Sequence, residues 1–295
     1  MDKISHKSFR LVKKIKDPKF EIDRLEFYSL SLFIGLKDFQ ILITDSETKQ
    51  CVLLEDYVFD PKIEASEKFK VINYIFDDHH LLLANFWRNI NLIIKNRVFS
   101  FVPKSIFNEE YINGYLKTHN TFNIEQEEVM LTYHKQLDIV NVFTVPKNLV
   151  DLTDRVYPNK KVRFIHQSSS LIDGVISKNE PGEKDVVSYI DRFGLHILVV
   201  KDNKLLFYNQ YVIKKFDDYL KFIRIAGSEL DFDLKQDNIK LYGYLGRETP
   251  HFNKLKETMT RLNLGSRPDN LNFSYVFDEV LEHQYFDLFS TDTIR

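Results

Sequence analysis

The sequence predicts an α/β protein built from two related halves, and three observations support this prediction. A run of three consecutive strands is predicted twice, over residues 28–59 and residues 187–213. Apolar residues at helical spacing follow each run. A polar segment at residues 177–184, interrupted by Pro181 and Gly182, separates the two copies and is the best candidate for a linker.

The two copies match in order and in residue type. β-branched and aromatic residues bounded by turn residues predict strands at 28–34, 39–43 and 51–59 in the first copy and at 187–190, 195–200 and 205–213 in the second. FQILI at 39–43 matches LHILV at 195–199 with an offset of 156 residues, and YVF at 57–59 matches YVI at 211–213 with an offset of 154. We therefore expect a duplication, in which Ile41 and Ile197 occupy equivalent buried strand positions.

The rest of the chain alternates between predicted strands and helices. In the first half we predict a short strand near 9–12, a strand pair at 91–94 and 98–102, a second strand pair at 129–133 and 137–145, and a single strand at 162–166. We predict helices behind a Ser66 cap, at 109–117 behind an Asn108 cap, at 148–156 and at 168–176. In the second half we predict a helix from 217, a strand at 239–242, a helix at 251–262 behind Thr249 and Pro250, a last strand at 271–276, and an aromatic tail packed on its own core.

Composition narrows the class of protein. The 295 residues are 43% hydrophobic and 28% charged with a net charge of −2, which is typical of a globular chain and offers no overall basic field for DNA. Cys51 is the only cysteine, so an intramolecular disulfide is excluded and a reducing compartment is favoured. No apolar run reaches the roughly 18 residues that a membrane span needs. We expect a cytoplasmic protein with no membrane span.

Two charged segments are candidate binding sites. Residues 1–24 hold eight Lys or Arg against four Asp or Glu, which would suit RNA contact, although a solvated terminus is the simpler interpretation. Residues 77–80 read Asp-Asp-His-His and offer the side-chain types that bind metals. Neighbours on a helix point about 100° apart, so we interpret them as a polar helix face or a helix break and predict no metal site.

The order strand–strand–strand–helix–strand–helix, occurring twice, resembles two tandem ribonuclease H-like domains in the arrangement of the actin-like ATPase fold. Residues 189–194 resemble the second phosphate loop of that superfamily, and residues 241–246 with the following Thr249 and Pro250 resemble its adenosine motif. The overall pattern, with Val102-Pro103 followed by Phe107, resembles an uncharacterised Bacteroidetes family with an actin-like fold. The resemblance implies domains at 1–178 and 179–295.

The same resemblance implies where a nucleotide would bind. Gly35 would belong to the first phosphate turn, Asp191 and Gly194 to the second, and Gly243 and Gly246 to the adenosine motif, with Asp191 orienting Mg²⁺ beside ATP. Several residues depart from that pattern. No Asp precedes Gly35, Phe193 stands where the superfamily usually has glycine, and Tyr244-Leu245 separates the two glycines of the last motif. The chain has nine glycines where about twenty would be average.

These departures favour a non-catalytic function. We predict an actin-like scaffold or interaction protein with a degenerate nucleotide cleft, no bound cofactor and a protein partner that the sequence does not identify. The alternative is an ATP-binding actin-like protein with an unorthodox site that would use ATP and Mg²⁺. A nuclease on this fold would need three or four converging carboxylates, and Asp191 is the only acidic residue that ends a predicted first strand.

Overall fold

A computed structural model describes residues 8–117, 122–192, 194–230 and 232–291. The described residues form two compact units. The first unit runs up to Ser169 and includes Leu271–Phe277, and the second comprises Ser170–Asn270 and the residues from Asp278 onward. The expected domain boundary at 178/179 stays a prediction about which parts fold on their own.

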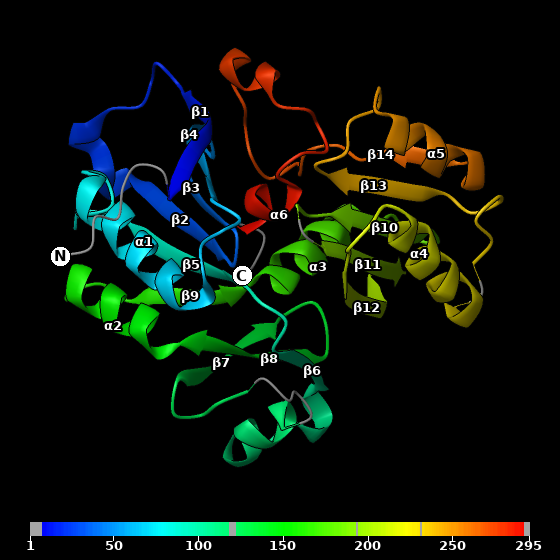
Figure 1. The fold of residues 1–295 in the computed structure, drawn as a ribbon, viewed down its shortest axis with the longest axis horizontal. Helices are drawn as coiled ribbons and strands as arrows, with labels where there is room; N and C mark the ends of the chain where they lie inside the picture. The colour runs from blue at the N-terminus through cyan, green and yellow to red at the C-terminus, as the bar shows by residue number, and fades with distance from the viewer. Residues whose placement is uncertain (1–7, 118–121, 193, 231, 292–295) are drawn as a thin grey trace. The chain divides into compact units, whose positions relative to one another are not determined.

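The first unit is built on a six-stranded sheet with the order β1-β4-β3-β2-β5-β9 (Figure 1). Its strands are β1 (Phe9–Lys16), β2 (Tyr28–Gly35), β3 (Asp38–Asp45), β4 (Cys51–Phe59), β5 (Asn89–Lys95) and β9 (Val162–His166). The meander β2-β3-β4 is antiparallel as predicted, and β5 and β9 run parallel to β2. A short 3-10 helix, η1 (Ile22–Phe27), connects β1 to β2.

Two helices cover one face of this sheet, α1 (Ala65–Asp78) and α2 (Lys147–Val156). Alternate residues of the strands pack against them, for example Phe39, Ile41 and Ile43 of β3, because successive side chains of a strand point to opposite faces. The predicted cap Ser66 lies inside α1 instead, since the helix begins two residues earlier, behind Glu64.

A smaller sheet of the first unit has the order β6-β8-β7, with β6 (Phe99–Pro103), β7 (Glu127–His134) and β8 (Ile139–Pro146). The predicted pairing of 91–94 with 98–102 is wrong, because β5 joins the large sheet whereas β6 pairs with β8. Asn96 redirects the chain at this point: its side chain binds the Val98 N–H and the Thr144 carbonyl. Between β6 and β7 lie the 3-10 helices η2 (Lys104–Ile106) and η3 (Glu109–Leu116), the latter capped by Asn108 as predicted.

The second unit has a five-stranded sheet with the order β12-β11-β10-β13-β14. Its elements are β10 (Lys184–Ile190), β11 (Gly194–Lys201), β12 (Lys204–Val212), α4 (Asp217–Leu230), β13 (Ile239–Gly243), α5 (Pro250–Thr258) and β14 (Leu262–Leu264). Helices α4 and α5 pack on the face that carries Leu195, Ile197 and Val199. Helix α3 (Gln167–Ser177) precedes this sheet in the chain.

Two predicted elements in the last third of the chain need correction. The helix behind Thr249 ends at Thr258, and residues 262–264 form a strand parallel to β13 instead. The predicted strand at 271–276 is reduced to one bridge, between Asn272 and Gln50, before the 3-10 helix η4 (Tyr275–Glu279). The aromatic tail packs on its own core as predicted, with α6 (Phe286–Phe289) buried.

The two units repeat one layout, which supports the predicted duplication. Strand order β4-β3-β2-β5-β9 in the first corresponds to β12-β11-β10-β13-β14 in the second. In the first unit, the strand pairing next to the β2–β3 turn joins Ile34 to Phe39. In the second unit, the pairing next to the β10–β11 turn joins Ile190 to Leu195, so the two turns have the same length. Ile41 and Ile197 consequently lie at the same register position of equivalent strands, both fully buried, as predicted.

The predicted linker is exposed at residues 180–183, but Asn179 is buried, contrary to expectation. The Asn179 amide donates to Asp185 Oδ2 at 2.9 Å, and its oxygen accepts the Asn203 N–H at 2.9 Å. These bonds attach the start of the linker to the second unit. Cys51 is a buried free thiol.

Candidate functional site

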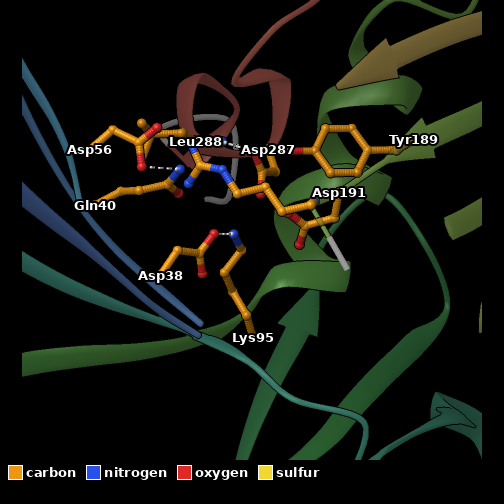
Figure 2. Close-up of polar contacts among 9 residues, drawn as sticks. Asp38, Gln40, Asp56, Lys95, Tyr189, Asp191, Asp287 and Leu288 are labelled. Carbon is orange, nitrogen blue, oxygen red and sulfur yellow. Dashed lines mark hydrogen bonds and ion pairs between the residues drawn. The ribbon is translucent and has the colours of Figure 1, made fainter. Parts of the chain in front are cut away.

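The first hairpin, residues 35–38, carries its own anion. Asp38 and Lys95 are both buried, and the Lys95 ammonium donates to Asp38 Oδ2 at 2.9 Å (Figure 2). A Cβ placed on Gly35 would lie only 2.3 Å from Asp38 Oδ1. The carboxylate therefore occupies the space directly against the Gly35 backbone, with Lys95 as its counterion. Glycine is needed at position 35 to admit this side chain.

Asp38 belongs to a polar strip on the sheet face opposite α1 and α2. Residues 39 and 41 face those helices, so Asp38 and Gln40 point the other way. Gln40 Nε2 donates to Asp56 Oδ1 on the neighbouring strand at 3.2 Å, as Figure 2 shows. Sequence reasoning missed Lys95, Gln40 and Asp56. The alternation of Asp38 and Gln40 with apolar residues was the available signal.

The second hairpin, residues 191–194, also uses its own carboxylate. Asp191 Oδ1 accepts the Arg192 N–H at 2.8 Å, and the Asp191 N–H donates to the Gly194 carbonyl at 3.0 Å. One backbone donor that a phosphate would need is thus engaged. A Cβ on Gly194 would lie 3.3 Å from the Tyr211 carbonyl, so this glycine permits close strand pairing. Phe193, which stands where the superfamily usually has glycine, lies outside the described residues.

The two hairpins carry the same two residue types at opposite ends. Because Ile34 and Ile190 are equivalent, Gly35 corresponds to Asp191, and Asp38 corresponds to Gly194. The aspartate follows the first strand of one hairpin and begins the second strand of the other. Only the strand register reveals this exchange.

Gly243 has a structural reason to be glycine, and Gly246 takes part in the cap of α5. Gly243 has φ +101°, and a Cβ there would lie 2.0 Å from the Ile190 carbonyl oxygen. Its N–H donates to the His283 carbonyl. The Gly246 carbonyl accepts the Thr249 hydroxyl at 2.8 Å, and that hydroxyl accepts the Phe252 N–H at the start of α5. A role of either glycine in nucleotide binding stays a prediction.

A cavity of about 390 Å³ lies in the second unit beside Asp191. Aromatic and basic side chains dominate its lining, which includes Arg192, Lys214, Lys215, Phe216, Tyr244 and His251. The Arg192 guanidinium lies over the Tyr244 ring at 4.4 Å, and the rings of Phe216 and His251 stack at 4.4 Å. Asp191 is the predicted site residue that lines this cavity, whereas Gly35 belongs to the first unit.

The C-terminal segment packs on the same unit. The Tyr189 hydroxyl donates to Asp287 Oδ1 at 2.6 Å, as drawn in Figure 2. Burial raises the pKa of Tyr189, and the negative charge of Asp287 raises it further. Tyr189 is therefore a neutral donor at physiological pH, and it holds α6 by a charge-assisted hydrogen bond.

A buried carboxylate, Glu55 of β4, organises a second polar cluster. It accepts hydrogen bonds from Tyr57 at 2.5 Å and His79 at 2.9 Å, and Lys14 lies 2.8 Å away. Burial alone would raise the Glu55 pKa, but the hydrogen bonds from His79, Lys14 and Tyr57 outweigh it and lower the pKa to about 2. His79 is also the cap that ends α1, so the predicted helix break is confirmed.

Three wider observations bear on function. Lys14 pairs with Glu55 and Lys16 lies 5.2 Å above the Phe20 ring, so part of the basic N-terminal segment serves the fold. Within the ranges that the structure describes, no group of three or more His, Cys, Asp or Glu side chains is arranged to hold a metal ion. No helix among the described residues is long and apolar enough to cross a membrane.

Comparison with known proteins identifies the fold. The family model described as "Protein of unknown function (DUF3822)" matches residues 17–259. A Bacteroides thetaiotaomicron protein with an actin-like ATPase fold and unknown function superposes with a TM-score of 0.74 at 19% identity, covering 83% of this chain and 93% of that chain. A chain of the PilM-PilN type IV pilus biogenesis complex superposes with a TM-score of 0.62 at 12% identity, covering 90% of this chain and 98% of that chain. The comparison with curated proteins yields no match. The chain therefore has the actin-like ATPase fold.

Proposed function

From the premise that the chain belongs to the DUF3822 family and has the actin-like ATPase fold, we propose that it is a non-catalytic scaffold or interaction protein with a degenerate nucleotide cleft. The observation that carries this proposal is the Asp38–Lys95 pair seated against Gly35. The first phosphate turn of an actin-like ATPase offers backbone N–H groups to an anion. Here a side-chain carboxylate of the same turn holds that place.

The negative charge of Asp38 is what would oppose a phosphate at the first hairpin. A polyphosphate entering the first hairpin would approach Asp38 and would have to displace it from Lys95. Separating a buried ion pair leaves an uncompensated charge and costs roughly 3 to 5 kcal/mol. In the second hairpin, Asp191 keeps the Arg192 N–H occupied. Both hairpins therefore oppose a phosphate by the same means, an internal carboxylate.

The proposal also includes a protein partner and a cytoplasmic location. The neighbour that superposes with a TM-score of 0.62 is a chain of a PilM-PilN complex, which supports protein partnership as a use of this fold. The single buried thiol, Cys51, suits a reducing compartment. The N-terminal basic segment adds RNA contact as a further prediction of lower weight.

A second candidate function is ATP binding at an unorthodox site. The cavity of about 390 Å³ in the second unit favours it, because basic and aromatic side chains suit an anionic ring compound. In this case Arg192 and the two lysines would supply the positive charge that the hairpins lack. The site would then hold nucleotide through the second unit alone.

Calorimetric titration with ATP and Mg²⁺ separates the two candidates. We expect no binding tighter than about millimolar, which corresponds to roughly −4 kcal/mol, and no hydrolysis above buffer. Asp191→Ala is the matched variant because Asp191 is the one carboxylate among the described residues that line the cavity. Micromolar affinity that disappears in this variant would overturn the scaffold proposal and establish the alternative.

A further inference from the structure

The first unit contains an apolar cavity of about 280 Å³ that borders the first hairpin through Gly35 and Lys95. It lies among α1, the ends of β2 and β5, and the start of α2. Ile72, Ile94 and Leu149 form buried walls, and Leu36 stands at the rim with 60% of its surface exposed. A bulky apolar side chain exposed beside an apolar cavity is a common mark of a binding surface.

A second hollow of about 410 Å³ lies between α1 and α2 and is lined by Asn73, Asp77, Asp151 and Arg155. Phe69 and Asn148 line both hollows, so the two are adjacent. We call the two adjacent hollows together the α1–α2 groove. Its length along two helices suits an extended or helical peptide better than a compact cofactor.

Lys68 stands at the end of the groove near the first hairpin. No carboxylate among the described residues lies within ion-pair distance of Lys68. Burial lowers the pKa of Lys68, and the nearby positive charge of Lys37 lowers it further. Lys95 is paired with Asp38, and the Glu127 carboxylate at this end is held away from Lys68 by hydrogen bonds from the Thr144 hydroxyl and the Asn123 N–H. An incoming carboxylate would relieve the repulsion at Lys68.

The other end of the groove is negative. Asp77 and Asp151 contribute two negative charges, and Arg155 contributes one positive charge. The Arg155 guanidinium donates to Asn73 Oδ1 at 3.1 Å. The groove thus has apolar walls and a lysine without an ion-pair partner among the described residues at one end, and two aspartates against one arginine at the other.

We propose that the α1–α2 groove binds a short segment of a partner protein, with a bulky apolar side chain in the 280 Å³ cavity, a carboxylate facing Lys68 and a basic residue facing Asp77 and Asp151. The proposal deepens the proposed function as an interaction protein and rests on it. Opposite charges at the two ends set the direction of the bound segment, because the reversed segment would place like charges together.

A random peptide library displayed on phage, selected on the full-length chain, tests this proposal. The blocked variant is Asn148→Trp, which places a large ring at the residue shared by both hollows. The matched control is Asp154→Trp on the same helix, at an exposed position outside both linings. Thermal unfolding of each variant verifies folding. Enriched peptides are expected to combine an acidic residue with a bulky apolar residue and to bind the control as they bind the parent chain.

Two results are required. Affinity of the synthesised peptides should fall at least tenfold in Asn148→Trp. It should also fall at least tenfold in Lys68→Glu and recover when the acidic residue of the peptide is replaced by lysine.

No enrichment above a bare surface, or equal binding to the blocked variant, would overturn the proposal. So would a concentration-dependent dimer that Asn148→Trp dissociates, because a second copy would then be the occupant. Nucleotide binding is read separately by calorimetry, so failure of the groove and failure of the scaffold proposal are distinguishable.

Discussion

Single residues in this protein carry constraints that their type alone does not disclose. Gly243 and Gly182 both have positive φ, at +101° and +85°, yet their surroundings differ. A Cβ on Gly243 would collide with the Ile190 backbone, whereas a Cβ on Gly182 would meet nothing within 4 Å. Gly243 is therefore required by the approach of β13 to β10, and Gly182 by turn conformation alone.

Gly243→Ala should lower the free energy of unfolding by roughly 3 kcal/mol or more, because backbone strain and a backbone collision add. Gly182→Ala, the matched control, should cost about 1 kcal/mol from strain alone. Urea denaturation measures both. Equal losses in the two variants would show that the contact with Ile190 relaxes without cost.

Glu55 links stability to pH. Its pKa is lowered from 4.5 to about 2 in the folded protein, because the hydrogen bonds from His79, Lys14 and Tyr57 outweigh burial. A carboxylate with a depressed folded pKa stabilises the fold above its unfolded pKa. That contribution is complete above about pH 4.5 and is lost as the pH falls toward 2.

Glu55→Gln should destabilise the protein by about 2 to 4 kcal/mol at pH 7, because a buried charged partner is removed from Lys14 and His79. The free energy of unfolding of this variant should also decline less between pH 4.5 and pH 3 than that of the parent. Glu64→Gln, an exposed glutamate ahead of α1, is the control. Parallel pH profiles for parent and Glu55→Gln would contradict the assignment.

At the scale of elements, the two hairpins show how one supersecondary pattern diverged. Both connect equivalent strands through turns of equal length, but glycine and aspartate have exchanged ends. In the first hairpin the carboxylate reaches back over Gly35 and captures Lys95. In the second it binds the next backbone N–H.

Asp38→Ala should convert the first hairpin into a better anion site, since Lys95 would lose its counterion and space would open against Gly35. Affinity for inorganic phosphate, measured by calorimetry, should rise at least tenfold, equivalent to about 1.4 kcal/mol. Asp45→Ala, at the far end of the same strand, should leave it unchanged. Unchanged phosphate affinity in a folded Asp38→Ala variant would remove the main support for the degenerate cleft.

At the scale of the whole chain, the compact units are not continuous in sequence. Leu271–Phe277 belongs to the first unit although the second unit surrounds it in sequence. Asn272 makes the connection: its N–H donates to the Lys49 carbonyl, and its own carbonyl accepts the Cys51 N–H. The chain thus returns to the start of β4 after building the second sheet.

Limited proteolysis should cut first at residues 180–183, which are exposed and without apolar anchors. The nicked protein should still elute as one species in gel filtration, because the C-terminal fragment retains Asn272 on the first unit, and should separate into two fragments in denaturant. Asn179→Ala should speed the cut by releasing Asp185 and Asn203, whereas Glu180→Ala should not. Earlier cleavage elsewhere would count against a domain boundary at 178/179.

The sequence by itself determined the duplicated meanders, their strand order and most helices, because period-2 and period-3.6 apolar patterns encode local structure directly. Even the offset of 156 residues proved to be the true register of Ile41 and Ile197. The actin-like fold followed from that order.

Only the tertiary structure decided which strands pair and what surrounds each candidate residue. β5 and β6 are adjacent in sequence but join different sheets, because pairing depends on which partner buries the apolar face. Lys95 meets Asp38 across 57 residues of chain. Whether the first hairpin could accept a phosphate depends on that long-range contact between one lysine and one aspartate. No local sequence pattern encodes this contact.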